Sequence, residues 1–160
     1  MKKTPLLLSL IASVFLFASC GRSVVFDEKV TFQYNNWDHN NKSQIFKAHL
    51  KGSEKPYSVI LELEIVGTPN VDKFFSDFII TSPNGGVTKK FVHFNLTNPK
   101  EPFIQGDSPN VKILQIIVFQ KKYFSETGIY TLNVDQFSNK FDNRGIRSLR
   151  MIIEKVKEKS

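Results

Sequence analysis

The sequence predicts an all-β protein, an antiparallel β-sandwich, of which a jelly roll is one form. Three observations carry this prediction. Apolar and polar residues alternate over several short segments, turn-forming residues recur every ten or so positions, and 15 of the 160 residues are phenylalanine, which favours strands. No helical pattern is equally clear, and no repeat or linker divides the chain. We therefore expect a single sandwich domain over residues 24–160.

Ahead of this domain the chain has the anatomy of a secretory signal peptide. Lys2 and Lys3 precede an uncharged, mostly apolar run from Pro5 to Ala18. This run is shorter than the roughly 20 residues that a membrane-spanning helix needs. Residues 1–19 are therefore predicted to be a signal peptide that is removed.

The only cysteine, Cys20, stands directly after this segment. Phe17-Ala18-Ser19-Cys20 resembles the lipobox of bacterial lipoproteins, in which Leu is commoner than Phe at the first position. The resemblance implies cleavage before Cys20, a diacylglycerol on its thiol and a further acyl chain such as palmitate on its amine. Two or more chains make a stable anchor, whereas one holds a protein only marginally. An ordinary signal peptide followed by an incidental cysteine is the alternative.

Residues 20–23 then form a short lipidated tether, which keeps the domain close to the membrane. One cysteine allows no disulfide framework, so the hydrophobic core must hold the fold alone. Removal of the signal peptide takes Lys2 and Lys3 and lowers the formal charge from +7 to +5. The remaining lysines are dispersed except in the tail after Glu154, and no basic helix or aromatic-basic platform appears. We therefore expect no nucleic-acid partner.

The first strands follow from period-2 alternation. Val30, Phe32 and Tyr34 alternate with polar residues, and a second strand is expected over residues 45–50. A polar loop around Trp37 separates the two.

The clearest alternation lies in residues 57–66. Apolar residues point to one face there, and Glu62 and Glu64 point to the other. This pattern predicts a strand with one solvent-exposed face.

A β-hairpin is predicted over residues 71–96. Its turn, Ser82-Pro83-Asn84-Gly85-Gly86, lies between two apolar runs. Val71, Phe74 and Phe78 also fit a helical face, but the turn favours a strand. The following loop, residues 98–110, contains three prolines and is either a functional loop or a Greek-key crossover.

Three further strands complete the sandwich. Residues 111–120 are almost continuously apolar, which predicts a strand buried on both faces. Residues 128–137 alternate again. Residues 146–156 fit a strand or a helix, and we prefer the strand.

No motif indicates catalysis. His39, His49 and His93 do not have the spacing of metal ligands, and the chain lacks a Gly-x-Ser-x-Gly elbow. Glu62 and Glu64 lie on one strand face as a glycosidase pair would, but a solvated strand face explains them equally. We therefore expect no enzymatic activity, no metal and no cofactor.

Aromatic residues offer the candidate contacts. Trp37, with Tyr34 and Tyr57, is a candidate for stacking on a sugar or for contacting a partner protein. The alternative is that Trp37 packs into the open end of the sandwich, because tryptophan mostly packs.

Several short motifs follow one another along the chain: Phe26-Asp27-Glu28, Trp37, residues 57–64, residues 82–86, residues 128–136 and residues 145–155. In this order, behind a lipobox, they resemble the gliding-motility lipoprotein H family of Bacteroidetes. The resemblance implies a non-catalytic cell-envelope protein that supports gliding motility, the linked protein secretion machinery, or both, through protein contacts. Of the residues of this chain, it assigns a role only to Cys20, as the lipid site.

The expected location is the periplasmic face of the outer membrane, because Gly21-Arg22-Ser23 stands where exposed lipoproteins of this phylum often carry acidic residues. An envelope glycan-binding or peptidoglycan-binding β-sandwich module is the alternative function.

Overall fold

The chain folds into β-strands joined by turns and two short 3-10 helices. The computed structural model describes residues 23–97, 103–138 and 140–156. Within these residues the 3-10 helices are η1 (Gln33–Asn35) and η2 (His39–Asn41). The strands are β1 (Val24–Thr31), β2 (Ser43–Leu50), β3 (Tyr57–Val66), β4 (Lys73–Thr81), β5 (Val87–Asn95), β6 (Ile104–Gln105), β7 (Val111–Lys122), β8 (Gly128–Gln136) and β9 (Ile146–Lys155).

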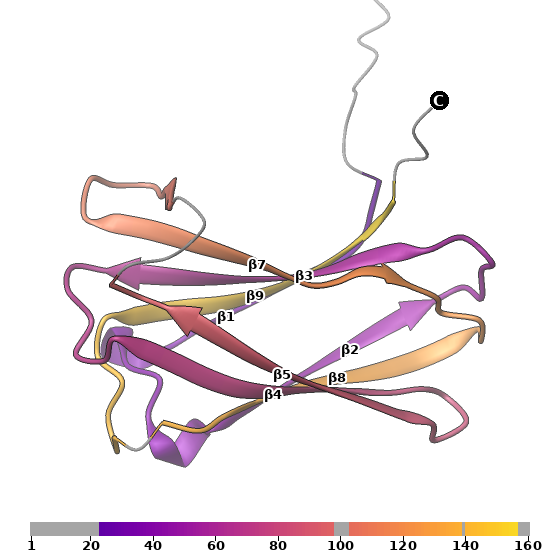
Figure 1. The fold of residues 1–160 in the computed structure, drawn as a ribbon, viewed down its shortest axis with the longest axis horizontal. Coiled ribbons are helices and arrows are strands. Elements are labelled where there is room, and N and C mark those ends of the chain that lie inside the picture. The colour runs from indigo at the N-terminus through magenta and orange to yellow at the C-terminus, as the bar shows by residue number, and fades with distance from the viewer. Residues whose placement is uncertain (1–22, 98–102, 139, 157–160) are drawn as a thin grey trace, which may run out of the picture.

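The strands form two antiparallel sheets that pack face to face (Figure 1). A five-stranded sheet has the order β1-β9-β3-β7-β6, and a four-stranded sheet has the order β2-β8-β4-β5. Both segments for which a helix was the alternative are strands, β4 and β9. The prediction of an antiparallel β-sandwich is confirmed.

The strand pairing is that of a jelly roll. Partners are nested around the β4–β5 turn: β4 pairs with β5, β3 with β7, β2 with β8 and β1 with β9. Successive pairs lie alternately in the four-stranded and the five-stranded sheet. The chain thus forms one long antiparallel hairpin of paired strands that wraps around a single core. This arrangement is the double Greek key of a jelly roll.

The β4–β5 turn confirms the hairpin predicted at Ser82–Gly86. Ser82 N–H donates to the Gly86 carbonyl at 2.8 Å, and the Asn84 side chain accepts from Gly86 N–H at 3.0 Å. Gly85 has φ +90°, which a residue with a side chain rarely adopts. The turn residues therefore fix the register of the hairpin.

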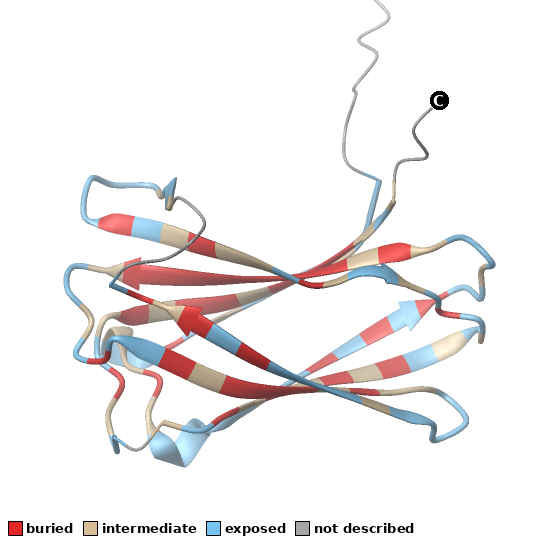
Figure 2. Ribbon diagram, viewed as in Figure 1, coloured by how far each residue is buried: buried red, intermediate tan, exposed pale blue. Residues whose placement is uncertain are grey.

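The core lies between the sheets and is rich in phenylalanine. Along the second half of β2, exposed and buried residues alternate (Figure 2). One face of this strand therefore packs in the core and the other faces solvent. Burial of these large side chains supplies most of the favourable free energy of folding. The largest side chains with no exposed surface include Trp37, Phe46, Phe74, Phe78, Phe94 and Phe124.

Two predictions about strand faces are wrong. Glu62 and Glu64 in β3 are each only 9% exposed, because β3 lies between β9 and β7 and neighbouring side chains cover its outer face. Conversely, β7 is not buried on both faces, and Ile117 is 54% exposed. β7 pairs along its length with β3, but on its other side the described residues supply only the two-residue β6.

The first strand also ends earlier than the alternation suggests. β1 stops at Thr31, and Tyr34 lies in η1 rather than in a strand. The proline-containing loop carries β6 and crosses from β5 in one sheet to β7 in the other, as a Greek-key crossover does. Part of that loop, residues 98–102, lies outside the described residues.

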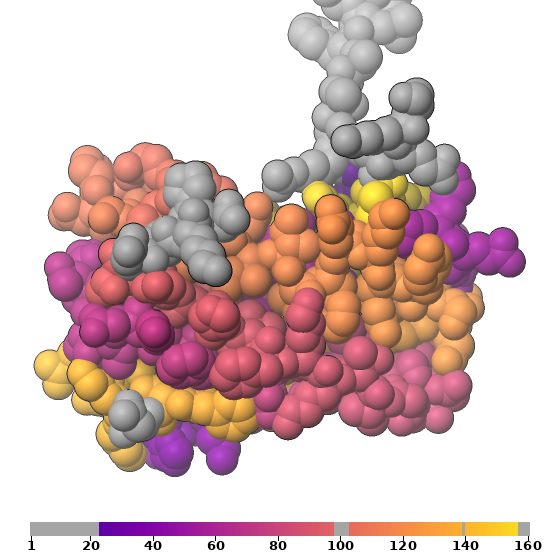
Figure 3. Space-filling view, in the orientation of Figure 1, coloured from indigo at the N-terminus to yellow at the C-terminus, as the bar shows by residue number. Residues whose placement is uncertain are grey.

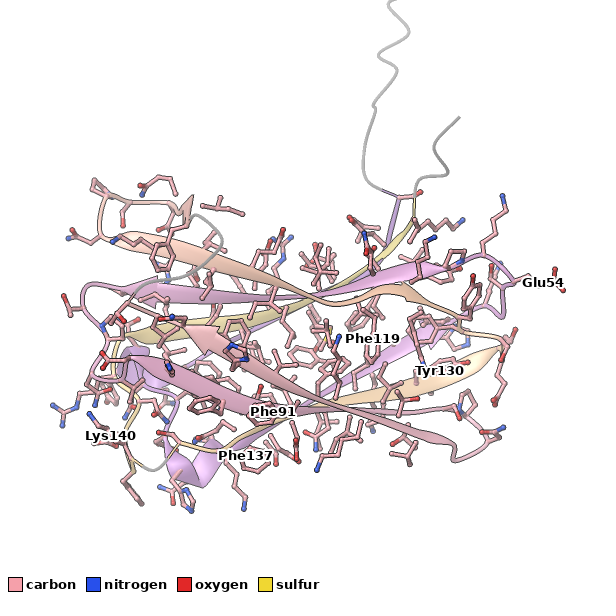
Figure 4. All side chains as sticks on the ribbon, in the orientation of Figure 1. Glu54, Phe91, Phe119, Tyr130, Phe137 and Lys140 are labelled. Atoms are coloured by element: carbon pink, nitrogen blue, oxygen red, sulfur yellow. The ribbon has the colours of Figure 1, made fainter. Side chains whose placement is uncertain are left out.

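Side chains of β5 and β7 close the side of the sandwich that faces the viewer in Figure 3. Phe119 of β7 lies between the two layers (Figure 4) and contacts the core residue Phe78, at 6.1 Å between ring centroids. The ammonium groups of Lys90 and Lys122 lie over the Phe119 ring, and Lys90 also donates to the Val118 carbonyl. These lysines cover part of the free edge of β7, which protects it from pairing with other chains.

Candidate functional site

Cys20, the predicted lipid site, lies outside the described residues. The described chain starts three residues later, at a well-defined corner of the five-stranded sheet. Ser23 accepts a hydrogen bond from Lys155 N–H at 3.0 Å, and Val24 pairs with Glu154. The start of β1 and the end of β9 therefore lie side by side, and any anchor at Cys20 would attach at this corner.

Trp37 is buried with no exposed surface. Its ring stacks on Phe32 and packs against Phe74, each at 4.8 Å between centroids. Its indole N–H donates to the Asn41 carbonyl at 2.7 Å. Trp37 is thus a packed core residue, and its buried ring cannot stack on a ligand.

The other two candidate aromatic residues do not lie with Trp37 on one surface. Tyr57 is 6% exposed at the start of β3, edge-on to Phe124. Tyr34 is 94% exposed and lies near the opposite end of β3, where Asn35 accepts from Gly145 N–H and Val66 donates to the Gly145 carbonyl. Of the three, only Tyr34 offers its ring to solvent.

Tyr34 belongs to an irregular surface that we call the loop end, formed by residues 33–41, 67–72 and 140–145. Tyr34 and Asn35 both have positive φ, +55° and +51°. A left-handed conformation is unusual for tyrosine and costs conformational energy, which is a recurring feature of functional sites. The strained backbone thus belongs to a segment whose aromatic side chain faces solvent.

Hydrogen bonds hold the loop end together. Asn143 is fully buried and donates to the Trp37 carbonyl at 2.7 Å, while Trp37 N–H donates to the Asn143 carbonyl at 3.4 Å. Asn36 donates to the Asp142 carboxylate at 3.2 Å. Next to this network Phe141 is 63% exposed. The loop end therefore combines fixed amides with exposed aromatic rings.

A row of ion pairs covers the outer face of the five-stranded sheet. Arg150 binds both oxygens of Asp27 at 2.6 Å and Glu62 at 3.0 Å. Arg147 contacts Glu64 at 2.5 Å, and the Ser148 hydroxyl donates to Glu64 at 2.6 Å. These partners explain how two glutamates can be buried in mid-sheet.

The same contacts set the charge of Glu64. The hydrogen bond from Arg147, with further help from Ser148 and against the opposing effect of burial, lowers the pKa of Glu64 to about 2. A general acid needs a pKa raised toward neutrality. Glu64 is therefore held as a carboxylate and is unsuited to the acid role in glycoside hydrolysis.

The four-stranded sheet has an outer surface that the sequence analysis missed. Phe91 is 57% exposed, Phe137 51% and Ile45 57%, and the first two are labelled on the lower sheet in Figure 4. We call this surface the aromatic face. It consists of Ile45, Phe75, Asp77, Ile79, Phe91, Asp135 and Phe137.

The signal for this surface is present in the sequence. Phe75 and Phe91 are out of phase with the core residues Phe74, Phe78 and Phe94, so they must point outward in a strand. The two outward rings stack at 5.8 Å between centroids.

The histidines do not come together. His39 lies 6.1 Å from the Phe141 ring and His93 lies 6.3 Å from the Phe75 ring, whereas His49 is exposed on β2. Within residues 23–97, 103–138 and 140–156 no three His, Cys, Asp or Glu side chains are grouped as metal ligands would be. Those residues also contain no helix long and apolar enough to span a membrane.

The strand order and pairing define the class of protein as an antiparallel jelly-roll β-sandwich. No protein-family model and no curated protein matches the chain. Among solved structures, the chain is similar to the Eiger TNF from S. frugiperda, with 12% sequence identity, coverage of 86% of this chain and 89% of that chain, and a TM-score of 0.38.

Proposed function

We propose that this protein is a lipid-anchored, non-catalytic component of the bacterial cell envelope. It supports gliding motility, the linked protein secretion machinery, or both, through protein contacts. The observation that carries the proposal is Cys20 in a lipobox-like segment, directly after a short basic and apolar leader. The ordered resemblance to the gliding-motility lipoprotein H family supplies the biological process.

The geometry of the domain is compatible with this role. The chain enters the domain at Ser23, beside the end of β9 in the five-stranded sheet. The aromatic face belongs to the other sheet and points away from it (Figure 1). An anchored domain can therefore keep the aromatic face free for another protein.

The anchor is tested by Cys20→Ala in the native cell. We expect the wild-type protein to incorporate labelled palmitate and to fractionate with membranes, and Cys20→Ala to lose both properties. Ser23→Ala, three residues away, is the matched control and should retain both. An unlabelled wild-type protein released from membranes by salt would contradict the proposal.

The functional role is tested by crosslinking in intact envelopes, followed by affinity purification and mass spectrometry. Recovery of motility or secretion components from wild type, and their loss with Cys20→Ala, supports the proposed role. Recovery of glycan or peptidoglycan alone would replace it with the alternative below.

A specific observation favours the alternative, an envelope glycan-binding module. Tyr34 is 94% exposed at the loop end, beside amide and carboxylate side chains that can hydrogen-bond sugars. Tyr34→Gly removes the ring and suits the observed φ of +55°. Loss of peptidoglycan co-sedimentation in this variant, with unchanged stability, would establish the alternative. Tyr123→Ala is the control, because it removes a ring that is 57% exposed near the opposite end of β3, next to Lys122, the partner of Tyr57.

A further inference from the structure

The aromatic face places two carboxylates inside an apolar surround. Cross-strand pairing aligns Ser43, Asp135, Asp77 and Phe91 in one row across β2, β8, β4 and β5. Asp77 and Asp135 are direct neighbours in this row, and like charges in this position repel.

Apolar side chains border that row on both sides. Phe137 N–H donates to the Phe75 carbonyl, so these two residues lie beside each other at one border. Ile45 and Ile79 lie at the other, with Asn133 between them. A protein that covers the exposed rings therefore also covers the carboxylates.

The two carboxylates differ in their partners. Asp77 is buried and forms an ion pair with Lys89. Asp135 accepts a hydrogen bond from the Ser43 hydroxyl and forms no salt bridge with any described residue. Asp135 also lines a hollow of about 350 Å³ together with Lys42 and Phe137. The centre of the face thus holds two negative charges and one paired positive charge.

We propose that the aromatic face docks a partner protein that places an arginine side chain over Asp135, next to the ring of Phe137. Covering Asp135 without a counter-charge would leave a desolvated carboxylate held by one hydroxyl, which is strongly unfavourable. A guanidinium can pair with the carboxylate and stack on an aromatic ring at the same time. A wholly apolar or acidic partner surface does neither.

This inference rests on one part of the proposed function, namely that the protein acts through contacts with other proteins. Its test needs neither lipid nor membrane, so failure of the anchor and failure of the docking surface are distinguishable.

The test is an NMR titration of the ¹⁵N-labelled processed chain carrying Cys20→Ser. The probes are acetyl-Leu-Arg-Leu-amide and the same peptide with citrulline, a neutral isostere, in place of arginine. We expect shifts centred on Asp77 and Asp135, and about 5-fold or greater weakening with citrulline, as for loss of a close charge pair.

Two variants complete the design. Asp135→Asn keeps an acceptor for the Ser43 hydroxyl and should bind both peptides equally, whereas Glu54→Gln, on the exposed β2–β3 loop (Figure 4), should behave as wild type. Equal binding of both peptides by wild type, shifts elsewhere, or a preference that survives Asp135→Asn would overturn the proposal. A wild-type dimer that dissociates on Phe91→Asp would also overturn it, because a second copy would then occupy the face.

Discussion

Trp37 closes the loop end from inside, between Phe32 and Phe74. We expect Trp37→Ala to lower the free energy of unfolding by about 3–5 kcal/mol, because it leaves a large cavity and removes the hydrogen bond to Asn41. Guanidinium denaturation measures this loss. Tyr34→Gly, three residues away but exposed, should not be destabilised. A Trp37→Ala variant within 1 kcal/mol of wild type would contradict this assignment.

Glu64 makes stability depend on acid pH. Its pKa is about 2 in the folded state, below the ordinary 4.5, so the unfolded chain binds the proton more tightly. The stabilisation is complete above pH 4.5 and is lost as pH falls toward 2. The upper limit of this loss is about 3–4 kcal/mol, from about 1.36 kcal/mol per pKa unit. Unfolding free energies of wild type and Glu64→Gln, measured from pH 6 to 2, should converge as pH falls; parallel curves would contradict the assigned cause.

At the scale of elements, the turn before β9 depends on a glycine. Gly145 has φ +91°, and a Cβ there would lie 2.8 Å from the Cα of Pro69. Gly67 also has positive φ, +64°, but has open space around it. We expect Gly145→Ala to cost about 2 kcal/mol or more and Gly67→Ala about 1 kcal/mol. Thermal unfolding of the two variants makes the comparison, and equal losses would show that the contact with Pro69 is unimportant.

The edge of β7 is the second element on which a prediction can be made. Lys90 and Lys122 lie over Phe119, and Lys90 also binds the Val118 carbonyl. Removing both lysines, with Lys90→Ala and Lys122→Ala, should increase concentration-dependent association in light scattering, because a less protected edge accepts another strand.

A matched control separates this effect from the change in net charge. Lys47→Ala with Lys73→Ala removes the same charge from β2 and β4, which do not pair with β7. Equal association of the two double variants would exclude protection of the β7 edge.

Strands were predictable because their signals are local. Alternation located β2, β3 and β8, and the Ser82–Gly86 turn located the β4–β5 hairpin. Which strand occupies the middle of a sheet depends on partners distant in sequence. The glutamates of β3 therefore suggested a solvated face, although Arg147 and Arg150 of β9 cover them.

For the whole molecule, the sequence could predict the sandwich but not how its surfaces are composed. The aromatic character of Tyr34, Trp37 and Tyr57 predicts a shared contact surface, yet the fold places Tyr34 and Tyr57 near opposite ends of β3. The outward phase of Phe75 and Phe91 is visible in the sequence, but that Asp135 and Phe137 lie on the same face follows only from the placement of β8 between β2 and β4. That placement brings Asp135 beside Asp77, which is 58 positions away in the chain. Pairings between such distant segments leave no local pattern.

The nested strand pairing constrains the order in which the protein can mature. Of the described strands, β1 is made first and β9 last, yet among them β1 pairs with β9 alone, and β9 also pairs with β3. The β4–β5 hairpin can close early, because its strands are adjacent, whereas the pairing of β1 with β9 must wait until β9 has been made. Until then β1 and β3 lack a partner strand on the edges that β9 will occupy, and these edges are open to pairing with other chains. Pairing of β9 with β1 thus completes the five-stranded sheet at the corner next to the predicted anchor.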